Sequence, residues 1–223
     1  ADFTAAEISA TLSVLAPHKA ADPQGFQAEH LKAGSEALIP LLVIILNRFY
    51  SDGFPSSEAL AHLVPILKKG DPSDPSNYRG ISIITVLAKL YATLLERRLS
   101  VAFDSANCRS RWQAGFRRRH STVDHIYTLL DLTTRAQRRG SRPIHVCFVD
   151  FSKAFDSVPR ALLWRRLELL NVPPKTLKAI QSYYDRVDIR VETTDGLSEP
   201  FPSTLGVKQG CPLSPTLFGI FID

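Results

Sequence analysis

An unbroken apolar run at residues 144–149, IHVCFV, constrains the fold most strongly. A run of this length and character is typical of a strand that is covered on both faces. Helical patterns precede it at 3–15, 26–34, 36–50, 86–98 and 121–139, with short strand-like stretches at 63–69 and 81–84. Helices follow it at 159–170 and 175–184, then a β-hairpin around 194–196 and an apolar helix at 216–222. Helices that outnumber strands in this order predict an α+β fold.

Cysteine usage and hydropathy limit the cellular compartments in which such a chain can fold and act. Its 223 residues include three cysteines, Cys108, Cys147 and Cys211, which are far apart and odd in number. This excludes a disulfide framework and predicts a reducing, intracellular compartment. The longest apolar run, residues 38–46, has about half the length of a membrane span, so we expect a buried helix and no membrane. The chain has no Met and stops inside an apolar pattern, which suggests a piece of a longer protein.

The positive charge is concentrated in one stretch. The chain carries a net charge of +5, yet residues 96–142 contain eleven Arg, no Lys and only four acidic residues. Guanidinium groups make paired hydrogen bonds to phosphate oxygens, so a nucleic acid is a natural partner. The alternative is a solvated helical face on which some Arg pair with acids.

Two aspartates follow the apolar run in the segment FVDFSKAFDSVP. Asp150 comes directly after the predicted buried strand, where a carboxylate is costly unless a cation or hydrogen-bond donors meet it. Mg²⁺ accepts one or two carboxylates together with substrate phosphates, so Asp150 is a candidate metal ligand. The alternative is that Asp150 caps the following turn. Asp156 is more simply explained as a cap of the next helix.

A turn-rich loop with basic flanks lies at residues 65–84, PILKKGDPSDPSNYRGISII. If its arms pair as a hairpin, Lys68, Lys69 and Arg79 could reach one anion, and this geometry would grip a triphosphate. The alternative is a weak surface bridge between Arg79 and Asp71 or Asp74.

Glycines bracket a glutamine in the segment GVKQGCPLSPTLF, residues 206–218. Because glycine removes side-chain bulk, Gln209 could approach a nucleotide closely here; the alternative is a plain turn before a helix. A similar polar turn, Gln113 to Phe116, lies in the Arg-rich stretch. Phe116 could stack on a base, although a core position is the simpler expectation.

Taken together and in order, PILKKGDPSDPSNYRGISII, QAGFRRRHSTVDHI, FVDFSKAFDSVPR and LGVKQGCPLSPTLF resemble a reverse transcriptase (RNA-directed DNA polymerase) of the non-LTR retrotransposon type. The resemblance implies the fingers and partial palm of a right-hand polymerase, without a thumb. Residues 1–142 would form the N-terminal helices and a fingers-like region, and residues 143–223 the first part of the palm. The partners implied are an RNA template, a DNA primer and dNTPs. The cofactor implied is Mg²⁺, two ions in the complete enzyme, with Mn²⁺ as an alternative.

The resemblance also implies residue roles. Asp150 and the backbone carbonyl of Phe151 would bind metal, and Phe155 would exclude a 2′-hydroxyl. The remaining nucleotide contacts would come from Lys68, Lys69, Arg79, Lys153, Ala154, Gln209 and Gly210. The template backbone would follow Arg109, Arg111, Phe116, Arg117, Arg118 and Arg119.

The departures from the family pattern matter as well. The aromatic-x-Asp-Asp hairpin of the family would lie beyond Asp223, so we expect this piece to be inactive alone. Gly80 stands where a proline is usual, and Lys208 stands where proline or a similar residue is usual. One alternative is a non-catalytic nucleic-acid-binding remnant of a retroelement, and another is a reverse transcriptase of the group II intron type. A nuclear location is expected in a eukaryotic host, and the sequence leaves the oligomeric state open.

Overall fold

The computed structural model describes residues 1–106, 108–117, 119–138, 144–185 and 187–223. Its α-helices are α1 (Ala5–Val14), α2 (Ala28–Ala33), α3 (Ser35–Asp52), α4 (Val86–Ala106), α5 (Thr122–Arg138), α6 (Arg160–Leu169), α7 (Pro174–Tyr184) and α8 (Ser214–Ile222). Its strands are β1 (Ala61–Leu67), β2 (Tyr78–Ile84), β3 (Asp188–Thr193), β4 (Gly196–Leu197) and β5 (Phe201–Pro202). Short 3₁₀ turns, η1 (Ser56–Glu58) and η2 (Pro75–Asn77), flank β1 and β2.

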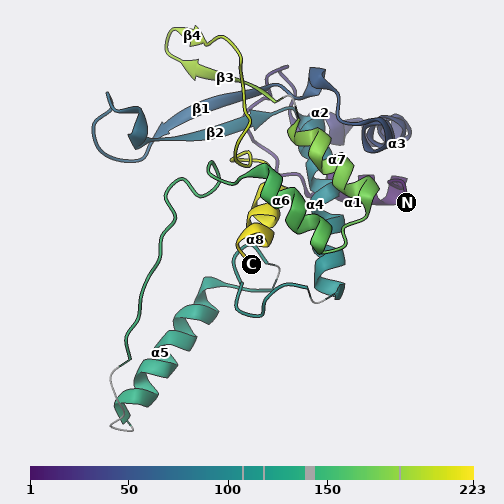
Figure 1. The fold of residues 1–223 in the computed structure, drawn as a ribbon. Coiled ribbons are helices and arrows are strands. Elements are labelled where there is room, and N and C mark those ends of the chain that lie inside the picture. The colour runs from purple at the N-terminus through teal and green to yellow at the C-terminus, as the bar shows by residue number, and fades with distance from the viewer. Residues whose placement is uncertain (107, 118, 139–143, 186) are drawn as a thin grey trace.

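A small mixed sheet lies beside a group of helices (Figure 1). β1 and β2 pair antiparallel with Ile66 opposite Arg79, which confirms the predicted hairpin. β3 joins the far edge of β1 in parallel, and β4 and β5 both pair with β3. The α+β prediction is therefore confirmed. The predicted boundary between 142 and 143 falls in the undescribed residues 139–143 and stays a prediction, although the sheet takes strands from both sides of it.

The core is built around α4, whose Tyr91 is fully buried. Aromatic rings of Phe3, Phe49, Phe54 and Tyr183 lie within 5.5–6.2 Å of the Tyr91 ring. Rings at these separations add edge and stacking contacts to the burial of apolar area. The aromatic cluster thus joins the N-terminal segment, α3, α4 and α7 into one core.

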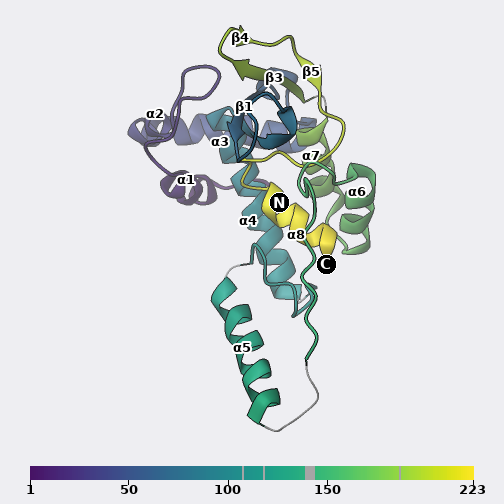
Figure 2. The same cartoon turned by 90° about the vertical axis from the view of Figure 1, so that its left-hand side faces the viewer.

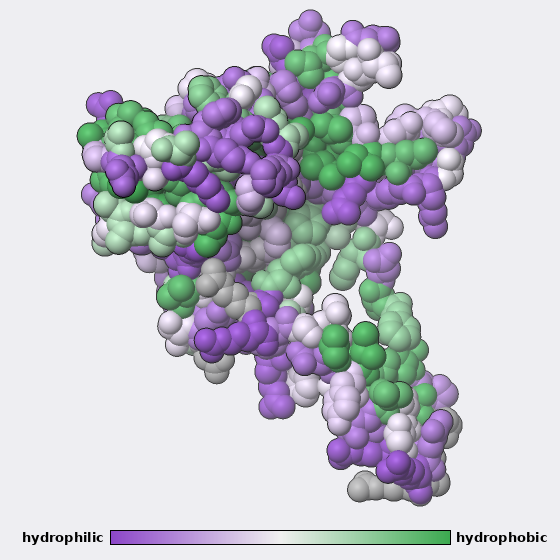
Figure 3. All heavy atoms as spheres, turned by 180° about the vertical axis from the view of Figure 1, so that it is seen from behind, coloured by the Kyte–Doolittle hydropathy of each residue, from purple (hydrophilic) through white to green (hydrophobic). Residues whose placement is uncertain are grey.

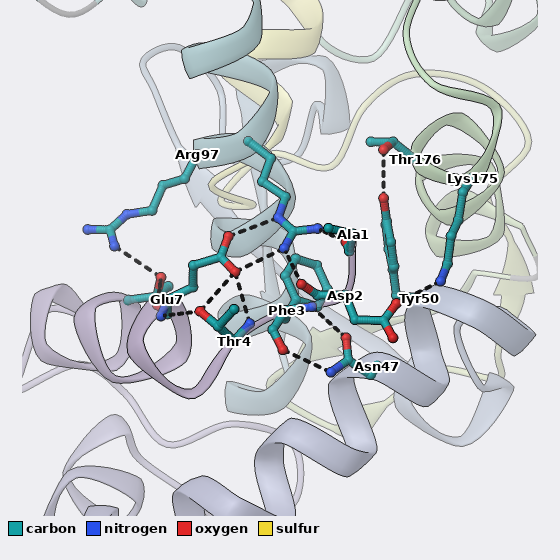
Figure 4. Close-up of polar contacts among 12 residues, drawn as sticks. Ala1, Asp2, Phe3, Thr4, Glu7, Asn47, Tyr50, Arg97, Lys175 and Thr176 are labelled. Atoms are coloured by element: carbon teal, nitrogen blue, oxygen red, sulfur yellow. Dashed lines mark hydrogen bonds and ion pairs between the residues drawn. The ribbon is translucent and has the colours of Figure 1, made fainter.

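Arg98, from the Arg-rich stretch, holds the N-terminus against α4 by donating to the Ala1 carbonyl. Figure 4 shows Ala1, Thr4 and Glu7 at this point of the fold. Its guanidinium donates to both carboxylate oxygens of Glu7 at 3.0 and 2.9 Å and lies 4.2 Å from the Phe3 ring centroid. The hydrogen bonds from Arg98 lower the pKa of Glu7 to about 2. Thr4 and Glu7 form the capping box of α1, as their spacing predicts. This arginine therefore has a structural role.

The prediction of a buried strand at residues 144–149 is wrong. Residues 144–150 have no regular secondary structure and are exposed, with Phe148 84% and Val149 75% accessible. An apolar run cannot form a strand without a neighbour to pair with, and no described strand lies beside it. Cys147, expected in the core, is exposed as a consequence.

The helix predicted at 121–139 forms as α5, but the apolar face of this helix is uncovered. α5 and the segment after residue 143 extend away from the other helices (Figures 1 and 2). Side chains of this face are exposed, among them Val123, Ile126, Tyr127 and Leu130. Figure 3 shows apolar surface on this projecting part. The periodicity predicted the helix correctly, but not its packing.

Hydropathy gives no membrane-crossing element in the described part of the chain: none of its helices is both long and apolar enough to span a bilayer. The three cysteines are free.

Candidate functional site

The β1–β2 hairpin carries three predicted site residues at its tip and outer strand. The tip is closed by the Lys68 N–H, which donates to the Asn77 carbonyl at 2.9 Å. Asp71 and Asp74 each accept a backbone N–H two residues on, and these hydrogen bonds lower the pKa of both carboxyls. Their side chains thus organise the turn and do not pair with Arg79, which contradicts that alternative. Lys68 and Lys69 are exposed at the tip.

The glycine-bounded loop at 206–210 lies between β2 and the turn at 152–157. The Gln209 carbonyl accepts the Ser82 N–H at 2.8 Å, and the Phe155 carbonyl accepts the Val207 N–H at 2.8 Å. Gly206 (φ +76°) and Gly210 (φ +100°) adopt backbone angles that favour glycine. A Cβ at Gly206 would lie 2.7 Å from the Asp156 carbonyl oxygen, and one at Gly210 2.9 Å from the Ser82 carbonyl oxygen. Glycine is therefore required for this close approach.

A series of side-chain hydrogen bonds links β2, the glycine-bounded loop and the turn at 152–157. Arg79 donates from Nε to the Gln209 side-chain oxygen at 3.0 Å. The amide nitrogen of Gln209 donates to the two Asp156 carboxylate oxygens at 3.2 and 3.3 Å. Asp156 does not cap α6, whose N-cap is Pro159 and has no side-chain cap, so that expectation is wrong. Gln209 thus contacts Arg79, which lies 130 positions before it in the sequence, and Asp156, which lies 53 positions before it.

Asp150 precedes Asp156 by six residues but takes no part in the hydrogen bonds that link Arg79, Gln209 and Asp156. Its carboxylate is exposed and receives no hydrogen bond from the described residues, so it does not cap the following turn. No group of three or more His, Cys, Asp or Glu within the described ranges is arranged to hold a metal. One free carboxylate beside the Phe151 carbonyl still fits a Mg²⁺ ion that takes its other oxygens from phosphates and water.

Phe155 lies in a stack of aromatic rings. Its ring is parallel to that of Phe218 at 4.9 Å and edge-on to that of Phe116 at 5.9 Å. Phe116 itself is 55% exposed, so the expectation of a core position for it is wrong. Lys153, at φ +50°, begins the turn that presents Ala154 and Phe155. The rings of Phe155 and Phe116 therefore each pack against a neighbouring ring and remain partly accessible to solvent.

The predicted template-binding arginines differ in their environments. Arg109 is buried against Phe103, and this burial lowers its pKa. Arg117 donates to the carbonyls of Ser110 and Gln113. Arg111 and Arg119 are exposed, and Arg118 lies outside the described residues. An open hollow of about 420 Å³ next to α4 is lined by Ser100, Val101, Asp104, Ser105, Arg117, Arg119 and His120.

Arg160, at the start of α6, holds the first residue of the glycine loop and has no predicted role. Its guanidinium donates to the carbonyls of Gly206, Tyr184 and Ser203 at 2.9, 2.9 and 2.6 Å. Burial lowers its pKa. A basic residue directly after Pro159, at a helix start, is the one signal that could have pointed to it.

Lys208, noted only as a departure, lies in the core. It is 6% exposed, and its Nζ donates to the Tyr183 carbonyl at 3.1 Å and lies 4.0 Å from the Tyr183 ring centroid. Burial lowers its pKa to about 8. Lys208 thus attaches the glycine-bounded loop to the buried C-terminal end of α7.

Comparisons with known proteins match the chain to one family. The family model for reverse transcriptase (RNA-dependent DNA polymerase) matches residues 66–223. The RNA-directed DNA polymerase from mobile element jockey of Drosophila funebris is 29% identical over 98% of this chain and 24% of its own length. The Pol polyprotein from the type-2 retrotransposable element R2DM of Drosophila melanogaster is 31% identical, over 86% of this chain and 18% of its own length. The chain therefore spans about a fifth of these relatives.

Proposed function

Because the chain belongs to the reverse transcriptase (RNA-dependent DNA polymerase) family, we propose that it carries the nucleotide-binding part of an RNA-directed DNA polymerase of a non-LTR retrotransposon. The reaction is attack of a primer 3′-hydroxyl on the α-phosphorus of a dNTP paired with an RNA template, with release of pyrophosphate. The β1–β2 hairpin and the helices before it would serve as fingers, and residues 143–223 as the first part of a palm.

One observation carries this proposal: Arg79, Gln209 and the turn after Asp150 meet in space although they lie far apart in the sequence. Arg79 and the two tip lysines offer positive charge for a triphosphate. Gly210 and Gln209 would line the incoming nucleotide and the template base, from a loop that Gly210 allows to pack closely against the Ser82 carbonyl of β2. The Phe155 ring would lie against the sugar and exclude a 2′-hydroxyl.

The metal site of this proposal uses Asp150 and the carbonyl of Phe151. Bound Mg²⁺ would supply charge neutralisation for the phosphates and lower the pKa of the primer hydroxyl. The backbone of Lys153 and Ala154 would face the triphosphate, and the exposed Arg111 and Arg119 the template backbone. A second carboxylate site, which two ions require, would come from sequence outside these 223 residues.

The test is single-nucleotide primer extension by the full-length protein on an RNA template. We expect incorporation of the complementary dNTP only, with dependence on Mg²⁺ or Mn²⁺. The alternative of a nucleic-acid-binding remnant, which the Arg-rich stretch favours, predicts tight RNA binding without incorporation.

Arg79→Ala should raise the KM for dNTP by about tenfold or more, because a charge-assisted hydrogen bond to phosphate contributes about 1.5–3 kcal/mol. The affinity for the template–primer should stay within about twofold. Steady-state kinetics and a filter-binding titration of the same preparation check both. Loss of template affinity with an unchanged KM would instead assign Arg79 to the template.

Phe155→Val should let the full-length protein incorporate ribonucleotides, because the smaller side chain leaves space next to C2′. We expect the ratio of kcat/KM for dNTP over rNTP to fall by about a hundredfold, equivalent to about 2.7 kcal/mol. Phe116→Val, which removes a neighbouring ring, is the matched control for lost aromatic packing. If both variants change sugar selectivity equally, Phe155 is not the gate.

A further inference from the structure

We propose that Asp156 is a positioning residue that fixes the amide of Gln209 and, through it, the guanidinium of Arg79. This inference rests on the proposed function, in which Arg79 and Gln209 contact the nucleotide. It gives a role to an aspartate that is not a metal candidate and does not cap the helix that follows it.

The chemistry of the three groups allows one arrangement of the amide. Arg79 can only donate hydrogen bonds, so it must face the Gln209 oxygen. An ionised Asp156 can only accept, so it must face the Gln209 nitrogen. A flipped amide would direct its N–H groups at Arg79 and its oxygen at Asp156, losing both contacts. The carboxylate therefore selects the orientation of the amide.

The orientation of the amide decides how Arg79 presents its donors. The bond to Gln209 uses Nε, which leaves the two terminal nitrogens for another acceptor. Paired donation from these nitrogens is the geometry in which arginine binds phosphate oxygens. The side chain of Arg79 is exposed and flexible, so without Gln209 its guanidinium would sample many positions. Holding it in advance lowers the entropy cost of nucleotide binding.

The backbone supports the same arrangement. Gln209 is fixed to β2 through its carbonyl and the Ser82 N–H, and Val207 is fixed to the Phe155 carbonyl. Gly206 brings the loop within contact of the Asp156 backbone. These backbone hydrogen bonds thus keep Gln209 at a fixed distance from Asp156.

The first readout needs no activity. In the full-length protein, the rate at which phenylglyoxal modifies Arg79 is measured by peptide mass mapping, without substrates. Asp156→Ala should speed this modification about threefold or more, since a single hydrogen bond held in place is worth a factor of about two to ten. Asp156→Asn keeps one acceptor oxygen but can also donate, so its rate should lie between those of wild type and Asp156→Ala. Asp195→Ala, an exposed aspartate in the β3–β4 turn, is the matched control and should have no effect.

The second readout is kinetic. Asp156→Ala should raise the KM for dNTP about three- to tenfold, with kcat and template–primer affinity nearly unchanged. In a Gln209→Ala background the same substitution should add nothing, because the group through which it acts is gone.

The outcomes separate the two claims. Unchanged Arg79 reactivity in Asp156→Ala, an additive effect in the Gln209→Ala background, or an Asp156→Asn variant as impaired as Asp156→Ala would overturn the role of Asp156. A full-length protein that incorporates no nucleotide would overturn the proposed function, while the phenylglyoxal rates would still decide whether Asp156 holds Arg79.

Discussion

Asp150→Asn should reduce templated nucleotide incorporation by the full-length protein by at least about a thousandfold. The substitution keeps the shape of the side chain and removes the charge that would hold a metal ion, which contributes several kcal/mol to the stabilisation of a phosphoryl-transfer transition state. Each 1.36 kcal/mol corresponds to a tenfold change in rate. The measurement is the single-turnover rate of extension by one nucleotide at saturating dNTP.

Folding should be unaffected, because Asp150 is exposed and has no hydrogen-bond partner among the described residues. The template–primer affinity of the variant should therefore equal that of wild type. Asp195→Asn removes an equally exposed carboxylate elsewhere and should retain full activity. Incorporation by Asp150→Asn within tenfold of wild type would remove Asp150 from the metal site.

Lys208→Met should stabilise the 223-residue chain by about 2 kcal/mol at pH 7. The ammonium of Lys208 is buried, and no ion pair joins it to a described acidic residue. Its pKa falls from 10.5 to about 8 on folding, which corresponds to a cost of about 3 kcal/mol for keeping it charged. Loss of the bond to the Tyr183 carbonyl offsets part of the gain. Methionine has a similar length and packs well against aromatic rings.

The sign of the pH dependence gives a second check. Between pH 8 and 10.5 the unfolded chain holds the Lys208 proton and the folded chain does not, so the contribution of this lysine to stability rises with pH. Relative to wild type, Lys208→Met should therefore lose about 3 kcal/mol over this interval, which takes it from about 2 kcal/mol more stable to about 1 kcal/mol less stable. Urea unfolding from pH 7 to 10 measures it. Lys178→Met, at an exposed position of α7, should change stability by less than about 0.5 kcal/mol at every pH. A pH-independent difference for Lys208→Met would contradict the account.

Local signals predicted the elements whose stability is local. The capping box of Thr4 and Glu7, the hairpin around Asp195 and the pairing of β1 with β2 follow from turn chemistry and periodicity, which involve neighbours in the chain. The run at 144–149 failed because its apolar character requires a partner strand that the sequence pattern does not identify. The same limit applies to α5, whose helical periodicity was predicted but whose packing contacts were not.

The candidate site shows a similar division. The motifs pointed to Arg79, Gln209 and the segment after Asp150, and the structure brings Arg79, Gln209 and that segment together. The role of Asp156 was missed because its partner lies 53 residues away. Arg160 and Lys208 were not assigned these roles because both donate to backbone carbonyls far away in the sequence, and neither a basic residue after Pro159 nor a lysine before Gln209 identifies such a partner.

The central claim is that the β1–β2 hairpin, the turn after Asp150 and the glycine loop form one nucleotide site. Hydrogen–deuterium exchange of the full-length protein tests it most directly, in a complex with an RNA template, a dideoxy-terminated DNA primer and Mg²⁺. The complementary dNTP, compared with a non-complementary one, should slow amide exchange together in peptides covering 66–84, 150–158 and 205–211. Protection of only one of these segments, or of none, would contradict a shared site.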